Sequence, residues 1–148
     1  MKVAILMGSP RDDEKMAGAS EMLTRFGVEH EVHVMSAHRT PEEVAEFASN
    51  ARSNGFGVII CGAGMAAHLA GVVSAHTTIP VIGVPLSGGI SGGMDALLST
   101  VQMPRGIPVA TVAVDGSANA GVLAVEILSL SNGDLAAQLQ RFRDEGAR

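Results

Sequence analysis

The feature that most constrains the fold of this chain is a set of short apolar runs separated by segments with helical character. Runs such as VAILM (3–7) and GVIIC (57–61) lack the polar–apolar alternation of a sheet with one solvated face. Strands of this kind are covered on both faces, as in a parallel sheet with right-handed crossover helices. We therefore predict a three-layer α/β domain. The predicted strands cover residues 3–7, 29–35, 57–61, 80–85 and 108–114.

The segments between these runs carry helix start and stop signals. Gly27 stands where a capping glycine belongs after a helix over residues 13–26. The stretch TPEE (40–43) places a threonine at the N-cap, a proline at the first helical position and a glutamate three residues after the cap. It therefore predicts a capping box and a helix that stops at Gly55. Further helices are predicted within 62–75 and around 94–100, 119–130 and 134–146.

Composition narrows the class of protein. An apolar fraction of 47% with 17% charged residues argues against disorder, and no apolar run is long enough to cross a membrane. A net charge of −5 with no Trp or Tyr argues against nucleic-acid binding. The short, weakly basic stretch 1–7 does not resemble a signal peptide, so we expect a cytoplasmic protein. The absence of linkers and internal repeats predicts one domain over 1–148, and its low charge favours a homo-oligomer.

Polar residues gather in the loops that follow the first three predicted strands. These loops are GSPRD (8–12), SAHRT (36–40) and GAGMAAH (62–68). In open parallel sheets, ligands bind in the crevice outside the carboxyl ends of the strands, where such loops meet. The polar residues of any one of these loops are no more than strand–helix loops usually contain. The three loops together, with a histidine in two of them, favour an active site at this edge.

The residue types in these loops suit an anionic substrate. Glycine N–H groups and serine hydroxyls can bind a phosphate, and the Arg39 guanidinium can pair with an oxyanion. The Asp12 carboxylate can accept hydrogen bonds from ribose hydroxyls. His38 or His68 can transfer a proton near neutral pH. The glycine spacing matches neither a dinucleotide fingerprint nor a Walker loop, and the stretch 87–93 (SGGISGG) is a candidate mobile cover.

Three other histidines and the one cysteine are expected to be structural. His30 and His33 lie three residues apart in a predicted strand, so their side chains point to opposite faces and cannot share a metal. His76 lies at a helix end, and Cys61 is expected to be a small buried apolar residue. A single cysteine excludes an internal disulfide and a multi-thiolate metal site. Because no cluster of ligand residues in the sequence supports metal ligation, we expect no bound metal.

Six stretches of the chain resemble one family, in order and over almost the full length. They are MGSPRD (7–12), SAHRTPE (36–42), GAGMAAHLAG (62–71), PVIGVP (80–85), GGMDALLSTVQMPRGIPVATVAV (92–114) and NAGVLAVEIL (119–128). This pattern resembles the 5-(carboxyamino)imidazole ribonucleotide mutases, the PurE-type catalytic subunits of phosphoribosylaminoimidazole carboxylase. The resemblance implies a flavodoxin-like (Rossmann-like) α/β fold, a homo-octamer, and no metal or organic cofactor.

The same resemblance implies a reaction and roles for individual residues. The enzyme would move a carboxylate from the exocyclic nitrogen of an imidazole ribonucleotide to ring carbon four, in purine biosynthesis. An ATP-dependent carboxyaminoimidazole ribonucleotide synthetase would be its pathway partner. His38 would be the general acid/base, and His68, the second predicted catalytic residue, would lie beside the imidazole. The implied substrate-binding residues are Gly8, Ser9, Arg11, Asp12, Ser36, Ala37, Arg39, Gly64, Ala67 and Leu69.

Two positions depart from the family pattern. Arg11 stands where the family usually has a serine, and Met65 stands where it often has a glycine. A serine at position 11 would donate a hydrogen bond to a phosphate, whereas an arginine could meet the phosphate or face solvent.

Two alternative functions remain open. The first is direct carboxylation of aminoimidazole ribonucleotide by free carbon dioxide. Relatives with that activity usually have a lysine after the loop histidine and a serine–asparagine pair in place of AAHL, so Arg39 and His68 favour the mutase. The second is a non-enzymatic receiver or flavin-binding module. A receiver needs acidic residues at 7–8 and 61–62, and a flavin module needs aromatic rings; the chain has MG, CG and no Trp or Tyr.

Overall fold

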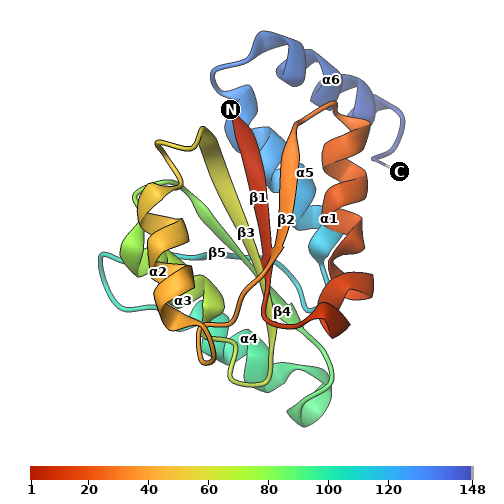
Figure 1. The fold of residues 1–148 in the computed structure, drawn as a ribbon. Helices are drawn as coiled ribbons and strands as arrows, with labels where there is room; N and C mark the ends of the chain where they lie inside the picture. The colour runs from red at the N-terminus through yellow and green to blue at the C-terminus, as the bar shows by residue number, and fades with distance from the viewer. Residues whose placement is uncertain (148) are drawn as a thin grey trace.

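A five-stranded parallel sheet forms the centre of the protein, whose computed structural model describes residues 1–147 (Figure 1). The strands are β1 (Lys2–Met7), β2 (His30–Val34), β3 (Phe56–Gly64), β4 (Val81–Leu86) and β5 (Ala110–Thr111). Their order across the sheet is β2-β1-β3-β4-β5, which is the flavodoxin-like order. The predicted three-layer α/β class is confirmed.

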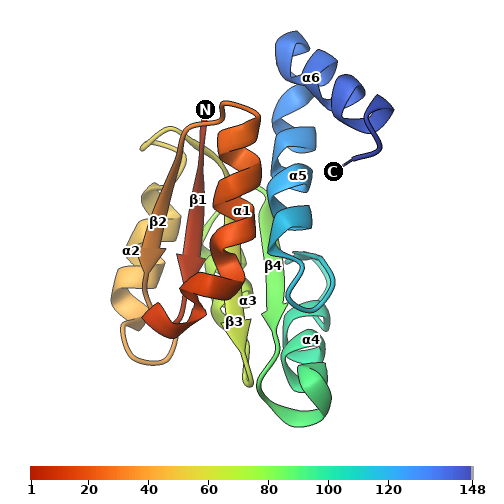
Figure 2. The same cartoon turned by 90° about the vertical axis from the view of Figure 1, so that its right-hand side faces the viewer.

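Helices cover both faces of the sheet. They are α1 (Asp13–Arg25), α2 (Pro41–Asn50), α3 (Leu69–His76), α4 (Met94–Val101), α5 (Ser117–Ser129) and α6 (Gly133–Asp144), with 3₁₀ turns η1 (Pro10–Asp12) and η2 (Ile90–Gly92). Helices α1 and α5 pack side by side on one face, while α2 and α3 cover the other (Figure 2). Helix α4 lies on the α3 side, because Thr100 of α4 and Ala70 of α3 approach the same face of Gly83. None of the helices within residues 1–147 is long and apolar enough to cross a membrane.

Strand β1 shows why the apolar runs lack alternation. Val3, Ile5 and Met7 are buried in the core beneath α1 and α5. Ala4 and Leu6 point the other way and are buried in the core beneath α2 and α3. Each position of the strand therefore faces one of two cores, and a polar residue at any of them would lose its hydration without a partner.

Glycines end the helices as the sequence predicts. Gly27 has a φ of +65°, in the region that side chains with a Cβ disfavour. Its N–H donates to the Thr24 carbonyl (3.0 Å), and the Val28 N–H donates to the Leu23 carbonyl (2.9 Å). These two bonds form a Schellman motif and satisfy carbonyls that the helix leaves free. Gly55, with a φ of +84°, closes the turns after α2 in the same way.

The start of α2 differs from the predicted capping box. Helix α2 does begin at Pro41 after Thr40, but the threonine side chain makes no capping hydrogen bond. Its hydroxyl oxygen instead accepts from the Ser36 N–H (3.0 Å), and the hydroxyl donates to the Ser36 carbonyl (3.3 Å). The capping-box prediction is therefore wrong, because the side chain closes the preceding loop rather than the helix. Regular helix also ends at Asn50, with turns continuing to Gly55.

The last strand is much shorter than predicted. Only Ala110–Thr111 pairs as a strand, whereas the sequence predicts strand over 108–114. Pro108 has no N–H to donate, and beyond Thr111 only the N–H groups of Val112 and Asp115 still bond to β4. Strand β5 lies at the edge of the sheet, and about half of the side chains of 108–114 are exposed to solvent. This apolar run can therefore be accommodated without a full ladder of hydrogen bonds to β4.

Candidate active site

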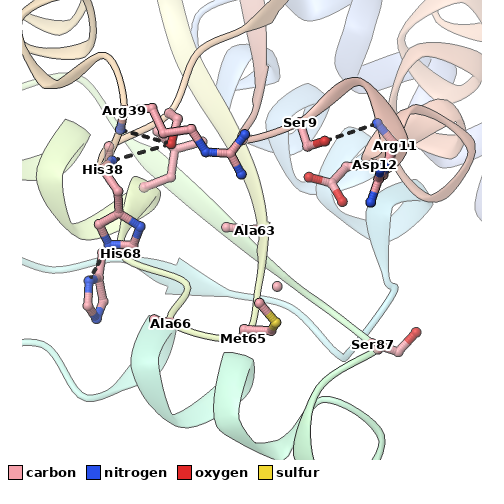
Figure 3. Close-up of a pocket in the computed structure, with 16 residues that line it drawn as sticks. Ser9, Arg11, Asp12, His38, Arg39, Ala63, Met65, Ala66, His68 and Ser87 are labelled. Carbon is pink, nitrogen blue, oxygen red and sulfur yellow. Dashed lines mark hydrogen bonds between the residues drawn. The ribbon is translucent and has the colours of Figure 1, made fainter.

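A cavity of about 350 Å³ opens at the carboxyl ends of β1 to β4, where the sequence predicts the site (Figure 3). All three predicted loops contribute to it, and the β4–α4 loop forms a fourth side. Its lining residues are Gly8, Ser9, Arg11, Asp12, Ser36, Ala37, His38, Arg39, Ala63, Gly64, Met65, Ala66, His68, Leu69, Ser87 and Gly88. The predicted site residues therefore come together, apart from Ala67, whose side chain is 1% exposed and does not line the cavity.

The β1–α1 loop forms one side of the cavity. The Ser9 hydroxyl oxygen accepts from the Arg11 N–H (3.3 Å), and the Ser9 carbonyl accepts from the Asp12 N–H (3.0 Å), so the loop turns tightly into η1. Partial burial raises the pKa of the Asp12 carboxyl, although the charge of Lys15 and the hydrogen bond with Ser9 act in the opposite direction. Because the Asp12 carboxylate is partly shielded from water, it is suited to accepting hydrogen bonds from hydroxyl groups of a ligand.

The β2–α2 loop presents the histidine and arginine of the SAHRT stretch. The Ser36 hydroxyl oxygen accepts from the backbone N–H groups of His38 and Arg39, each at 3.3 Å. This turn directs the Arg39 side chain across the cavity toward the side that holds Ser9 (Figure 3). Within residues 1–147 the Arg39 guanidinium forms none of the ion pairs, so its charge is available to an anionic ligand.

The two predicted catalytic histidines are hydrogen-bonded to each other. His38 Nε2 lies 2.8 Å from His68 Nδ1, and the ring planes are inclined by 82° (Figure 3). One of these nitrogens must donate and the other accept, so the pair holds a proton between the β2–α2 and β3–α3 loops. Both side chains are exposed to the cavity rather than packed in the core. The pair can therefore give a proton to a ligand and replace it from the partner ring.

The β3–α3 loop carries an unusual backbone at the position where the resemblance expects a glycine. Met65 has a φ of +54°, in the left-handed region that favours glycine. Its side chain is 62% exposed and forms part of the cavity lining. A methionine therefore holds a backbone conformation here that glycine adopts more easily, at the cost of local strain.

Sequence reasoning named the stretch 87–93 only as a candidate mobile cover and did not place Ser87 or Gly88 among the binding residues. Ser87 and Gly88 follow β4, and they line the cavity by the same rule that places the other three loops. Ser87 is held by Lys15 of α1 and by Asp115 before α5. The strand prediction at 80–85 could have pointed to Ser87, but no local pattern marks the two partners.

The residues expected to be structural lie outside the cavity. His30 Nε2 is 2.9 Å from the Ser20 hydroxyl on the α1 side, while the His33 ring stacks near Phe47 on the α2 side, so the prediction of opposite faces is confirmed. Cys61 is buried, as predicted, and burial raises the pKa of its thiol far above the usual value. Among residues 1–147 no three His, Cys, Asp or Glu side chains gather closely enough to hold a metal ion.

Comparison with known proteins identifies a family. The model of the AIR carboxylase family matches residues 2–148. An N5-carboxyaminoimidazole ribonucleotide mutase from Vibrio vulnificus is 52% identical over 147 residues, which cover 98% of this chain and 91% of that one. A chloroplastic phosphoribosylaminoimidazole carboxylase from Vigna aconitifolia is 49% identical over 143 residues, covering 97% of this chain but 26% of that longer protein.

A solved structure agrees with the sequence comparison. The crystal structure of Treponema denticola PurE superposes with a TM-score of 0.89 and 29% identity, covering 98% of this chain and 90% of that one. The flavodoxin-like fold and the resemblance of the six stretches are therefore confirmed. From its four-loop cavity, its family model and these relatives, the chain belongs to the AIR carboxylase family.

Proposed function

We propose that this protein is an N5-carboxyaminoimidazole ribonucleotide mutase of purine biosynthesis. The observation that carries the proposal is the hydrogen-bonded pair of His38 and His68, 2.8 Å apart, in the same cavity as Arg39, whose guanidinium forms none of the ion pairs within residues 1–147. The relatives that match along almost the whole chain bear the name of this activity. The pair supplies a mobile proton, and the arginine supplies a charge for a phosphate, which are the two needs of this reaction.

The half of the cavity formed by the β1–α1 loop would hold the phosphoribosyl group. Arg39 crosses toward it, and a guanidinium can bind phosphate oxygens with two parallel hydrogen bonds (Figure 3). Ser9 offers a hydroxyl at the same side, and the partly buried Asp12 carboxylate would accept from ribose hydroxyls. Arg11 also lines this half, so we assign it to the phosphate as a second cation. The imidazole would then lie beside the histidine pair.

The chemistry requires one proton to be given and one to be taken. His38 would protonate the carbamate nitrogen, the carbon–nitrogen bond would break, and carbon dioxide would leave an electron-rich aminoimidazole. Ring carbon four would then attack the carbon dioxide, and the base would remove the proton from that carbon. Because the two fragments stay in one cavity, recombination is effectively unimolecular. His68 would share the proton with His38 between the two steps.

An isotope experiment tests this proposal. Substrate carrying a carbon-13 carbamate is turned over in unlabelled bicarbonate buffer, and the label is measured in the carboxylated product by mass spectrometry. Retained label means direct transfer within the cavity, as the mutase proposal requires. Label lost to the buffer means that free carbon dioxide is the substrate, and the carboxylase alternative replaces the mutase. Absence of product refutes both enzymatic assignments and returns the question to a binding module.

The direct carboxylase is kept as the second candidate because some relatives carry the name phosphoribosylaminoimidazole carboxylase. The Vigna aconitifolia protein is 49% identical over the segment that it shares with this chain. Both reactions need the same nucleotide contacts and the removal of a proton from ring carbon four. Only the mutase must first protonate the carbamate nitrogen, because only there does carbon dioxide arrive bound to nitrogen. The labelling experiment separates them directly.

We infer that the protein assembles with copies of itself, and we keep the homo-octamer as the proposed state. An apolar strip on α4 supports this: Met94, Leu98 and Val101 are 48%, 49% and 45% exposed. They recur at intervals of four and three residues, so they lie along one face of the helix. The neighbouring Ile90 is 73% exposed. We expect Leu98→Glu to shift the mass measured by native mass spectrometry toward smaller species, and an unchanged mass would exclude this face.

The remaining proposals concern the setting of the enzyme. An ATP-dependent synthetase would make the carbamate, because a carbon–nitrogen bond to bicarbonate does not form without activation. We expect the protein in the cytoplasm, where a reducing environment suits its single buried thiol, Cys61. Microscopy of the tagged full-length chain in its host would test the location.

A further inference from the structure

One lysine ties the fourth side of the cavity to the first. Lys15 Nζ of α1 donates to the Ser87 carbonyl oxygen (2.6 Å) and to the Ser87 hydroxyl oxygen (2.8 Å), across 72 residues of sequence. The ammonium forms none of the ion pairs within residues 1–147, and both of its hydrogen-bond acceptors are uncharged oxygens of one residue. Hydrogen bonds from a charged donor are stronger than those between neutral groups.

Asp115 holds the same serine from the opposite side. Its carboxylate accepts from the Ser87 backbone N–H at 2.9 Å. Partial burial raises the pKa of Asp115, but the hydrogen bonds from the hydroxyl and N–H of Ser87 and the charge of Lys15 outweigh it, so the pKa lies below its usual value. Asp115 also has a φ of +56°, a conformation that costs free energy for a residue other than glycine. Such strain persists only where surrounding contacts impose it.

The segment that these contacts hold, residues 87–93 after β4, has a sequence that favours a flexible backbone. Gly88 has a φ of +118°, and Ser91, Gly92 and Gly93 also have positive φ values. A glycine-rich segment loses more backbone entropy on ordering than an ordinary loop. Ser87 and Gly88 are the residues of this segment that line the cavity. In Figure 3 Ser87 lies on the opposite side of the cavity from the histidine pair.

The position of Lys15 links it to nucleotide binding rather than to proton transfer. Lys15 binds Ser87, which in turn donates to Asp115 before α5, and its charge acts against the burial that raises the pKa of Asp12 in the β1–α1 loop. The ammonium therefore lies between that loop and the turn before α5. That is the half of the cavity assigned above to the phosphoribosyl group. None of its hydrogen bonds reaches His38 or His68.

We propose that Lys15 is a positioning residue that, with Asp115, clamps Ser87 and Gly88 as the fourth wall of the nucleotide site and so sets its affinity. The proposal rests on the mutase function proposed above. If Ser87 and Gly88 are already ordered in the free protein, ligand binding does not have to order them, and the observed binding free energy is more favourable by that entropy. Loss of the clamp therefore weakens nucleotide binding and leaves the chemical step almost unchanged.

The test compares Lys15→Met and Lys15→Arg with a matched control, Lys2→Met. The chain has two lysines, and Lys2 lies at the other end of β1, where it pairs with Glu31 and stacks on Phe56. We would measure the dissociation constant of 5-aminoimidazole ribonucleotide by calorimetry, kcat and KM for the carbamate, and hydrogen exchange of the Ser87 amide. Exchange reports on the clamp whether or not the protein has the proposed activity.

We expect Lys15→Met to raise the dissociation constant and KM about 5- to 30-fold, because a charged hydrogen bond is lost, and to change kcat less than about threefold. Exchange of the Ser87 amide should accelerate about tenfold or more. Lys15→Arg should restore most of the affinity, and Lys2→Met should leave it unchanged. In a double variant, Lys15→Met and Asp115→Ala should be less than additive, since both act through Ser87.

Two results would overturn the clamp. Unchanged exchange at Ser87 in Lys15→Met would show that the lysine does not order the segment. Faster exchange with unchanged nucleotide affinity would show that the order has no effect on binding. Failure of both enzymatic assignments has a different signature, because the wild-type protein would then not bind the nucleotide, while the exchange result would stand. A direct carboxylase would still bind 5-aminoimidazole ribonucleotide, so the labelling experiment, and not this one, separates it from the mutase.

Discussion

The histidine pair offers the sharpest test of the site, through the variants His38→Asn and His68→Asn. Both side chains are exposed at the cavity, and they contact each other through the 2.8 Å bond between Nε2 and Nδ1 and an edge-to-face ring contact. Exposed substitutions away from the core usually change the free energy of unfolding by less than about 0.5 kcal/mol. We therefore expect both variants to fold with urea midpoints close to that of the wild type.

The expected loss of activity is far larger than the loss of stability. A general acid/base contributes about 10²- to 10⁴-fold to a rate, so His38→Asn should lower kcat by that factor. His68→Asn leaves His38 in place but removes the ring that orients it and shares its proton. Misplacing a catalytic group by about 1 Å can cost about 10²-fold, and we expect a loss of about 10- to 100-fold.

The double variant shows whether the rings act as a unit. If they share one proton, the loss in His38→Asn/His68→Asn should be close to that of His38→Asn alone. His76→Asn is the matched control, because His76 ends the same α3 helix whose N-cap is His68 and does not line the cavity. It should retain wild-type kcat. If the fold losses of kcat in the two single variants multiply in the double variant, the two rings do not share one proton. Near-wild-type turnover in His38→Asn would show that His38 takes no part in catalysis.

Three further predictions concern binding, packing and pH. Arg39→Ala should raise KM for the carbamate at least about tenfold through loss of a charged hydrogen bond, as steady-state kinetics would show; an unchanged KM contradicts its role. Gly121→Ala should destabilise by about 1–3 kcal/mol in urea unfolding, because the new Cβ would lie 2.9 Å from the Ala19 carbonyl oxygen of α1, whereas Gly133→Ala, with open space around it, should not. Partial burial raises the pKa of Asp115, but hydrogen bonds and the nearby ammonium hold it below 3.8, so its stabilisation is present above that pH and lost below it. Asp115→Asn should flatten this acid loss in urea titrations from about pH 5 to pH 2, and equal slopes would contradict it.

Much of the site can be predicted from the sequence because the carboxyl ends of neighbouring parallel strands lie at the same edge of the sheet. The apolar runs predict a parallel sheet, and a parallel sheet brings every strand–helix loop to one edge. His38 and His68 were predicted on that edge. Their direct hydrogen bond was not, because it depends on the order β2-β1-β3, in which the two loops meet across the end of β1.

Contacts distant in sequence mark the limit of such reasoning. Lys15 and Ser87 are 72 residues apart, and Ser87 and Asp115 are 28 apart, so no periodic pattern joins them. The capping box failed for a related reason. The Thr40 hydroxyl can bond to the helix or to the loop before it, and the local sequence fits both. The tertiary position of Ser36 decides between them.

Backbone strain gives a physical reason why the active edge resists prediction. Of the non-glycine residues with positive φ within residues 1–147, Met65, Ser91 and Asp115 all lie in segments at the carboxyl edge of the sheet, and the fourth is Ala147 near the chain end. Local propensity assigns glycine to such positions, so it fails where contacts override it. At Met65 the backbone is left-handed although the residue is a methionine. A left-handed conformation at a residue that disfavours it must be imposed by the surrounding loops, and it is these loops that form the cavity.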